Sequence, residues 1–186
     1  MKKILSLIAV AFVAMSVNAQ VYVGGSVSVN AWSSQKFAAK NADKSETTFK
    51  ILPEVGYNLN DEWAIGAVIG YQSDKWEGVE GIECKSENAF TFNPYARYTF
   101  LKSGKVSLFV DGGVDFTTAS KADWNEIAVG FKPGLAVSLT DNISFVSHVG
   151  FIGWDQFNPD GDDNNISKFG LDLSGANLLF GLYFNF

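Results

Sequence analysis

Six charged residues stand out at polar positions of segments whose side chains alternate between apolar and polar, and their chemistry is that of enclosed ion pairs. Three are acidic and three are basic: Lys50, Glu54, Arg97, Asp111, Asp115 and Lys132. Counting from nearby turn sequences places Arg97, Asp111 and Lys132 at similar heights. Charges removed from water are tolerated only when they are paired and hydrogen-bonded. We interpret the six as a structural network that fills an interior, and a gated conduction path is the alternative.

The other residues with reactive side chains favour no catalytic site. The only histidine, His148, follows Ser147 directly, and adjacent strand residues point to opposite faces. A Ser–His dyad, which needs both groups within hydrogen-bond reach, is therefore not supported. We predict no enzyme activity and no cofactor, and a lipid-modifying enzyme is the least favoured alternative.

Two further features could bind or react, but their patterns are unspecific. Hard cations prefer the oxygen ligands that an acidic segment offers at Asp155, Asp160, Asp162 and Asp163. Their order does not match an EF-hand loop, so we predict a solvated acidic loop and no metal site. Cys84 is the single cysteine, which excludes an intramolecular disulfide and leaves a free thiol in a loop.

The N-terminus has the layout of a secretory signal peptide. Lys2 and Lys3 precede an apolar run that ends at Val17-Asn18-Ala19, which predicts cleavage after Ala19. The run is shorter than the roughly 20 residues of a transmembrane helix, the alternative reading. The predicted organisation is a signal peptide over residues 1–19 and one domain over residues 20–186.

Composition narrows the class of that domain. Of 14 basic and 20 acidic residues, two lysines fall in the predicted signal peptide, leaving 12 basic against 20 acidic residues. This balance disfavours nucleic acid, because phosphate binding needs basic patches. The aromatic content of 15% and the 18 glycines favour short strands over helices.

Eight segments of the predicted domain alternate with the period of two that indicates β-strands. They span residues 20–32, 47–59, 62–72, 88–101, 105–117, 126–139, 143–154 and 168–186. Short turns at 60–61, 102–104 and 140–142 alternate with long loops at 33–46, 73–87, 118–125 and 155–167. Short turns at one end and long loops at the other are typical of outer-membrane barrels, in which the short turns are periplasmic.

The direction of the apolar face separates two kinds of eight-stranded barrel. A lipocalin-like barrel turns its apolar face inward, and a membrane barrel turns it outward. Here the apolar face carries bulky residues, including Phe151 in the seventh segment, whereas the other face is rich in small polar residues that fit a narrow interior. The sequence therefore predicts a closed, eight-stranded, antiparallel, up-and-down transmembrane β-barrel.

Three prolines present a difficulty for this fold. Pro53, Pro94 and Pro133 precede three short turns in a repeated pattern and lie on the apolar face. Proline removes a hydrogen bond from a sheet and is rare in central strands. We expect local β-bulges that bend these three strands.

The last strand carries the most specific resemblance. Leu178-Leu179-Phe180-Gly181-Leu182-Tyr183-Phe184-Asn185-Phe186 ends on an aromatic residue preceded by alternating apolar residues. The chain resembles the small OmpA/OmpX-type outer-membrane barrels, and above all the Bacteroidetes-type outer membrane protein beta-barrel domain. The resemblance implies that Leu182, Phe184 and Phe186 form the signal read by the barrel-assembly machinery.

The resemblance and the alternation together set the functional expectation. We predict an exported, integral protein of a Gram-negative outer membrane, monomeric and surrounded by outer-membrane lipids. Its expected role is structural or adhesive, with long extracellular loops that could bind a ligand. A narrow porin-like channel for small solutes or ions is the alternative.

Overall fold

The computed structural model describes residues 20–34, 44–77, 85–119, 124–158, 165–173 and 177–186. The predicted signal peptide lies outside these residues, as do Cys84, Asp160, Asp162 and Asp163. Among the described residues, no helix has the length and apolar character needed to cross a membrane.

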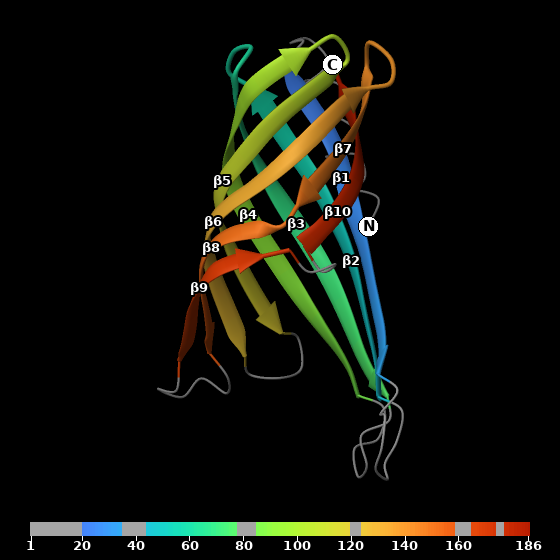
Figure 1. Cartoon of the computed structure of the whole chain (residues 1–186), viewed down its shortest axis with the longest axis vertical. Helices are drawn as coiled ribbons and strands as arrows, with labels where there is room; N and C mark the ends of the chain where they lie inside the picture. The colour runs from blue at the N-terminus through green and yellow to red at the C-terminus, as the bar shows by residue number, and fades with distance from the viewer. Residues whose placement is uncertain (1–19, 35–43, 78–84, 120–123, 159–164, 174–176) are drawn as a thin grey trace, which may run out of the picture.

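Ten β-strands form one antiparallel sheet that closes on itself (Figure 1). They are β1 (Val21–Ser34), β2 (Lys44–Asn58), β3 (Trp63–Glu77), β4 (Lys85–Ser103), β5 (Val106–Ala119), β6 (Asn125–Ser138), β7 (Ile143–Val149), β8 (Phe151–Asn158), β9 (Ile166–Asp172) and β10 (Leu178–Asn185). On one side, β6 pairs first with β7 and then with β8, so β7 and β8 together form one strand of the wall. On the other side of that strand, β10 pairs with β7 and β9 pairs with β8, so β9 and β10 together form another. Pairing of β1 with β10 closes the ring, which confirms the predicted eight-stranded barrel.

Tight turns join the strands at one end of the barrel, at the top of Figure 1. Asn60 Oδ1 accepts hydrogen bonds from the backbone N–H groups of Glu62 and Trp63. Thr140 Oγ1 does the same for Asn142 and Ile143. These side chains satisfy the donors that a reversal of the chain frees, which is why short polar residues stand at the predicted turns. We call this end the turn side and the opposite end the loop side.

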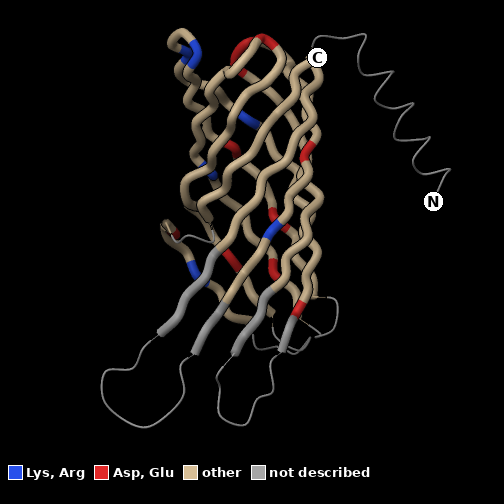
Figure 2. Tube along the Cα trace, turned by 90° about the vertical axis from the view of Figure 1, so that its right-hand side faces the viewer, with Lys and Arg blue, Asp and Glu red and all other residues tan. Residues whose placement is uncertain are grey.

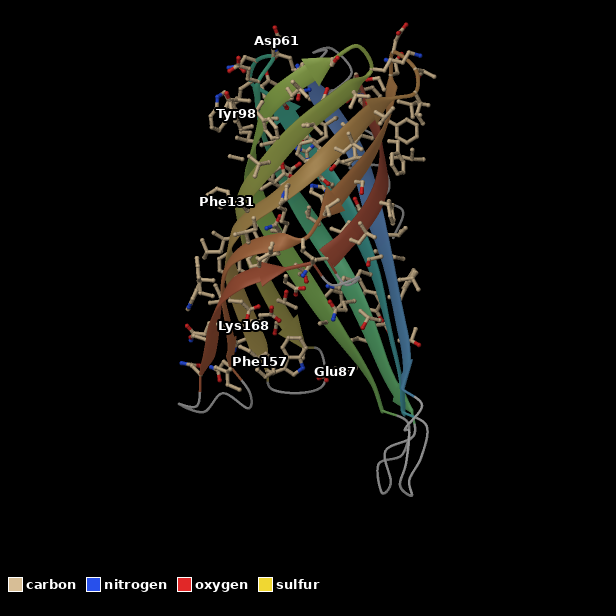
Figure 3. All side chains as sticks on the ribbon, in the orientation of Figure 1. Asp61, Glu87, Tyr98, Phe131, Phe157 and Lys168 are labelled. Carbon is tan, nitrogen blue, oxygen red and sulfur yellow. The ribbon has the colours of Figure 1, made fainter. Side chains whose placement is uncertain are left out.

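The barrel is apolar outside and polar inside. The outward positions of each strand carry exposed large apolar residues; Phe131, labelled on the outside of the wall in Figure 3, is 58% exposed. Glu54, Arg97, Asp111 and His148 are buried inside. Figure 2 shows that most positions along the wall are uncharged and that the charged positions are scattered along the strands and at the tight turns. This distribution excludes the lipocalin-like alternative, whose apolar face would line the lumen.

The wall has one large irregularity, at Gly150 between β7 and β8. Gly134 faces His148 and Phe131 faces Ile152, so three steps along β6 correspond to four along its neighbour. Gly150 adopts a φ of +80°, and a Cβ there would lie 2.8 Å from the Asp172 carbonyl oxygen. Only glycine fits this left-handed, crowded position.

The break at Gly150 reverses the alternation that the sequence showed before it. Phe151 turns into the lumen, where its ring would lie 2.7 Å from a Cβ at Gly130. The prediction that Phe151 faces lipid is therefore wrong. After the break the strand continues as β8 to Asn158, and Asp155 is buried on its inward face. The prediction that Asp155 lies in a solvated loop is therefore also wrong.

The expected bulges are also wrong at Pro53 and Pro94. Pairing keeps a constant register through Pro53 and Pro94, and the register shift in β4 lies between Thr99 and Leu101. Pro94 has no backbone N–H to donate to the neighbouring strand. The side chain of the preceding residue, Asn93, supplies a donor there instead, with its Nδ2 3.1 Å from the Val114 carbonyl oxygen. Pro133 keeps its register with β5, and its other side adjoins the break at Gly150.

Candidate functional site

A buried cluster around Arg97 crosses the lumen between the turn side and the middle of the barrel. Arg97 on β4 lies directly opposite Asp111 on β5, and residues paired across two strands share a face. Arg97 Nε donates to Asp111 Oδ1 at 2.7 Å and Arg97 Nη2 donates to Asp111 Oδ2 at 2.8 Å. This two-point geometry matches a guanidinium to a carboxylate and is stronger than a neutral hydrogen bond.

Two more strands, β2 and β10, also hold the guanidinium. Arg97 Nη2 lies 3.5 Å from Glu54 Oε1 on β2 and donates to Tyr183 Oη on β10 at 3.2 Å. Tyr183 Oη in turn donates to Glu54 Oε2 at 2.6 Å. Both carboxylates therefore compensate the Arg97 guanidinium. The Arg97 side chain is only 9% exposed, and a buried charge of this kind needs paired, hydrogen-bonded partners.

Aromatic rings complete the cluster. Tyr95 donates to Glu54, and its hydroxyl lies 2.6 Å from that of Tyr22. The rings of Tyr22 and Tyr183 stack with centroids 5.2 Å apart, and the Arg97 guanidinium lies 4.0 Å from the ring centroid of Phe109. A cation over an aromatic face is stabilised by the ring quadrupole, more so when water is excluded.

Each of these four rings lies opposite a glycine on the neighbouring strand. The register pairs are Tyr22–Gly56, Tyr95–Gly66, Phe109–Gly134 and Tyr183–Gly24. A Cβ at any of the four glycines would overlap the ring that faces it. Glycine on the inward face thus leaves the room in which the rings fill a narrow lumen.

His148 joins the cluster from β7. Its Nε2 lies 2.7 Å from Asp111 Oδ2, and its ring meets the edge of Phe109 with centroids 5.3 Å apart. A carboxylate that accepts from Arg97 accepts here too, so His148 Nε2 carries the proton. We define the Arg97 plug as Arg97, Glu54, Asp111, His148, Tyr22, Tyr95, Tyr183 and Phe109.

The six charges predicted from the sequence divide into separate groups. Glu54, Arg97 and Asp111 meet in the plug. Lys132 shares its row with Asp111, but its Nζ pairs with Asp115 Oδ1 at 2.7 Å, nearer the loop side. Lys50 lines the cavity beyond that pair. The structure therefore brings three of the six together and places the other three around a cavity.

Sequence reasoning placed His148 and the three tyrosines on the inward face but did not join them to the charge network, and it missed Glu126 and Asp155 as parts of the interior. The inward parity of Tyr22, Tyr95 and Tyr183 was visible in the alternation, but their mutual contact depends on the register of strands far apart in the chain. Asp155 left no such signal, because its direction depends on the break at Gly150.

Cavities lie on both sides of the plug. The loop-side cavity has a volume of about 550 Å³ and is lined by plug residues Glu54, Tyr95, Asp111 and His148 at one end. The turn-side cavity has a volume of about 290 Å³ and is lined by Arg97, Asn58, Thr99 and Lys102 among others. Arg97 therefore faces one cavity while its two carboxylate partners face the other.

The closed barrel, its apolar outer face and its polar, side-chain-filled interior define a small integral outer-membrane β-barrel protein. The chain belongs to the family of the outer membrane protein beta-barrel domain, whose sequence model matches residues 4–175.

Solved structures share the fold. The crystal structure of the outer membrane protein OprG from Pseudomonas aeruginosa superposes with a TM-score of 0.53 and 15% sequence identity, over 89% of this chain and 94% of OprG. The crystal structure of Neisserial surface protein A gives a TM-score of 0.51 and 16% identity, over 91% of this chain and 98% of that one. No curated protein matches this chain in sequence.

Proposed function

We propose that this protein is a non-conducting outer-membrane barrel with a structural or adhesive role, in which a plugged lumen supports an interaction surface on the loop side. The Arg97 plug carries the proposal. Its side chains come from β1, β2, β4, β5, β7 and β10 and hydrogen-bond or stack across the lumen. An ion crossing the barrel would have to separate a buried guanidinium from two carboxylates, which is energetically costly.

No catalytic role is part of this proposal. His148 uses Nε2 to hold Asp111, and Ser147 lies between Leu135 and Phe180 in the register, on the outer side of the wall. The two side chains therefore belong to opposite faces of β7.

Single-channel recording in planar bilayers separates a plugged barrel from the alternative, a narrow channel. The wild-type protein is expected to give no unitary current steps, whereas Arg97→Ala, if folded by the heat-modifiable migration test, is expected to give small ones. Regular wild-type steps with a defined ion selectivity would replace the plugged barrel with the channel.

The proposal includes export and assembly by signals at the two ends of the chain. Leu182, Phe184 and Phe186 lie exposed on the outer side of the last strand, a surface that the assembly machinery could read. Phe186→Ala is expected to lower the amount of folded barrel in outer-membrane fractions, and N-terminal sequencing of the mature protein is expected to begin at Gln20. An unchanged amount of folded barrel in Phe186→Ala would contradict the assembly signal. Retention of residues 1–19 in the mature protein would contradict the signal peptide.

A further inference from the structure

The loop-side cavity ends at the Arg97 plug and has the lining of a binding site. Its volume of about 550 Å³ falls within the range of about 300–1,000 Å³ typical of small-molecule sites. Leu52, Val68, Phe151 and Leu179 supply apolar surface on the inner wall, where polar residues otherwise prevail. The lining is thus amphipathic, with a closed end.

Three buried polar atoms in this lining have no hydrogen-bond partner among the described residues. They are Ser26 Oγ, His148 Nδ1 and Asp155 Oδ1, from side chains that are 3%, 5% and 9% exposed as residues. Asp155 Oδ1 only accepts hydrogen bonds, the Ser26 hydroxyl accepts or donates, and His148 Nδ1 accepts when the ring is neutral with its proton on Nε2. All three atoms can therefore accept a hydrogen bond, and unsatisfied buried polar atoms are rare enough to require a cause.

The charged residues of the lining also favour a ligand that donates hydrogen bonds and carries positive charge. Six carboxylates, those of Glu54, Asp111, Asp115, Glu126, Asp155 and Asp172, line the cavity together with three lysines. Glu54 and Asp111 pair with Arg97, Asp115 pairs with Lys132, and Asp172 also has a partner of its own. A cleft with an excess of one sign concentrates ligands of the other sign.

Glu126 and Asp155 lie side by side in this lining. Asp155 faces Ala128 on β6, and Glu126 stands two residues further along the same face. The nearest cation to Asp155 Oδ1 is Lys168 Nζ at 3.6 Å, on a side chain that is 73% exposed. Such a solvated pair contributes little, so a better-placed cation can displace it.

We infer that the loop-side cavity binds a small organic cation, an ammonium with an apolar body, whose N–H groups donate to Asp155 beside Glu126. The apolar body lies against the apolar lining residues Leu52, Val68 and Phe151, and Ser26 and His148 accept any further hydrogen-bond donor. This site is independent of the proposed lack of conduction, since a barrel that leaked ions would keep the same acceptors.

Calorimetric titration of the full barrel in detergent micelles tests the ligand class on the wild-type protein. Benzylammonium, benzyl alcohol and benzoate share one apolar body and differ in charge, and titration into empty micelles corrects for partitioning. Benzylammonium is expected to bind at least tenfold more tightly than benzyl alcohol, since a hydrogen bond to a charged group is worth that factor or more. Equal binding of the alcohol, or tighter binding of benzoate, overturns the inference.

Two substitutions test the position. Asp155→Asn keeps the shape and removes the charge, and is expected to weaken benzylammonium binding about tenfold. Asp61→Asn, the same change in the exposed turn between β2 and β3, is expected to leave binding unchanged. Lys168→Met removes the competing cation and is expected to tighten binding, an effect that damage to the fold would not produce. With folding verified by heat-modifiable migration, equal affinity of wild type and Asp155→Asn, or weaker binding in Lys168→Met, overturns the site.

Discussion

The same eight strands enclose two different interiors. Around Arg97 and toward the turn side, rings face glycines across neighbouring strands, and β1 pairs on both sides from Tyr22 to Val27. On the loop side the lumen widens into the cavity. There, among the described residues, Ser28–Ser34 of β1 pair only with β2, and β9 pairs only with β8.

The exposure of β9 marks this difference most clearly. Every residue of β9 is exposed, and Phe169 reaches 81%. Six steps from Asp172 to Leu178 face only two from Phe151 to Val149, so the pairing of the last strand is interrupted opposite the Gly150 break. The comparison teaches that an inward polar face does not by itself fill a barrel. Filling requires large rings opposite glycines and a charge network between them.

The largest difference between the two regions is expected from Arg97→Ala. Removing the guanidinium leaves Glu54 and Asp111 buried without their cation, which typically costs about 3–5 kcal/mol. Urea unfolding in detergent, followed by tryptophan fluorescence, measures the free energy of unfolding. Arg97→Lys keeps the charge but loses the two-point geometry, so its free energy of unfolding is expected to lie between those of Arg97→Ala and the wild type. A wild-type free energy of unfolding in Arg97→Ala would mean that the plug does not stabilise the turn-side half.

A matched pair of glycine substitutions gives the next largest contrast. A Cβ at Gly24 would overlap the Leu182 backbone carbonyl and the ring of Tyr183, whereas a Cβ at Gly170 on β9 meets nothing within 4 Å. Gly24→Ala is expected to lower the free energy of unfolding by about 1–3 kcal/mol, and Gly170→Ala to change it by less than about 0.5 kcal/mol. Similar values for the two variants would remove the distinction between a filled and an open half.

The smallest effect is expected from the loop-side ion pair. The side chains of Lys132 and Asp115 are 23% and 17% exposed beside a cavity, so water partly replaces the lost partner. Lys132→Gln is expected to cost about 1 kcal/mol or less in the same unfolding titration, far less than Arg97→Ala. A loss as large as that of Arg97→Ala would show that the loop-side half is as tightly built as the plug.

Much of this fold could be predicted from the sequence because alternation with a period of two is a local signal. It gave the inward direction of Glu54, Arg97 and Asp111 and the outward direction of Leu182 and Phe184. It failed at Phe151, because one glycine with a positive φ reverses the phase and nothing nearby in the sequence distinguishes it from other inward glycines.

The site was less accessible to the sequence than the fold. The equal height of Arg97 and Asp111 followed from counting residues from the turns. The bond between His148 and Asp111 depends on side-chain reach, and the contact of Tyr22 with Tyr95 joins residues 73 positions apart. Such contacts are set by how the whole ring of strands closes, which no local pattern encodes.

Directional thiol labelling tests most directly that the Arg97 plug separates the two interiors. Thr117 lines the loop-side cavity and Thr99 lines the turn-side cavity, so Thr117→Cys and Thr99→Cys, each with Cys84→Ser, place one thiol on either side. A charged, membrane-impermeant maleimide is supplied to the loop side of barrels reconstituted in one orientation. We predict labelling of the Thr117→Cys variant alone, with the Thr99→Cys variant labelled only from the turn side. Equal labelling of both variants from the loop side would contradict a closed plug.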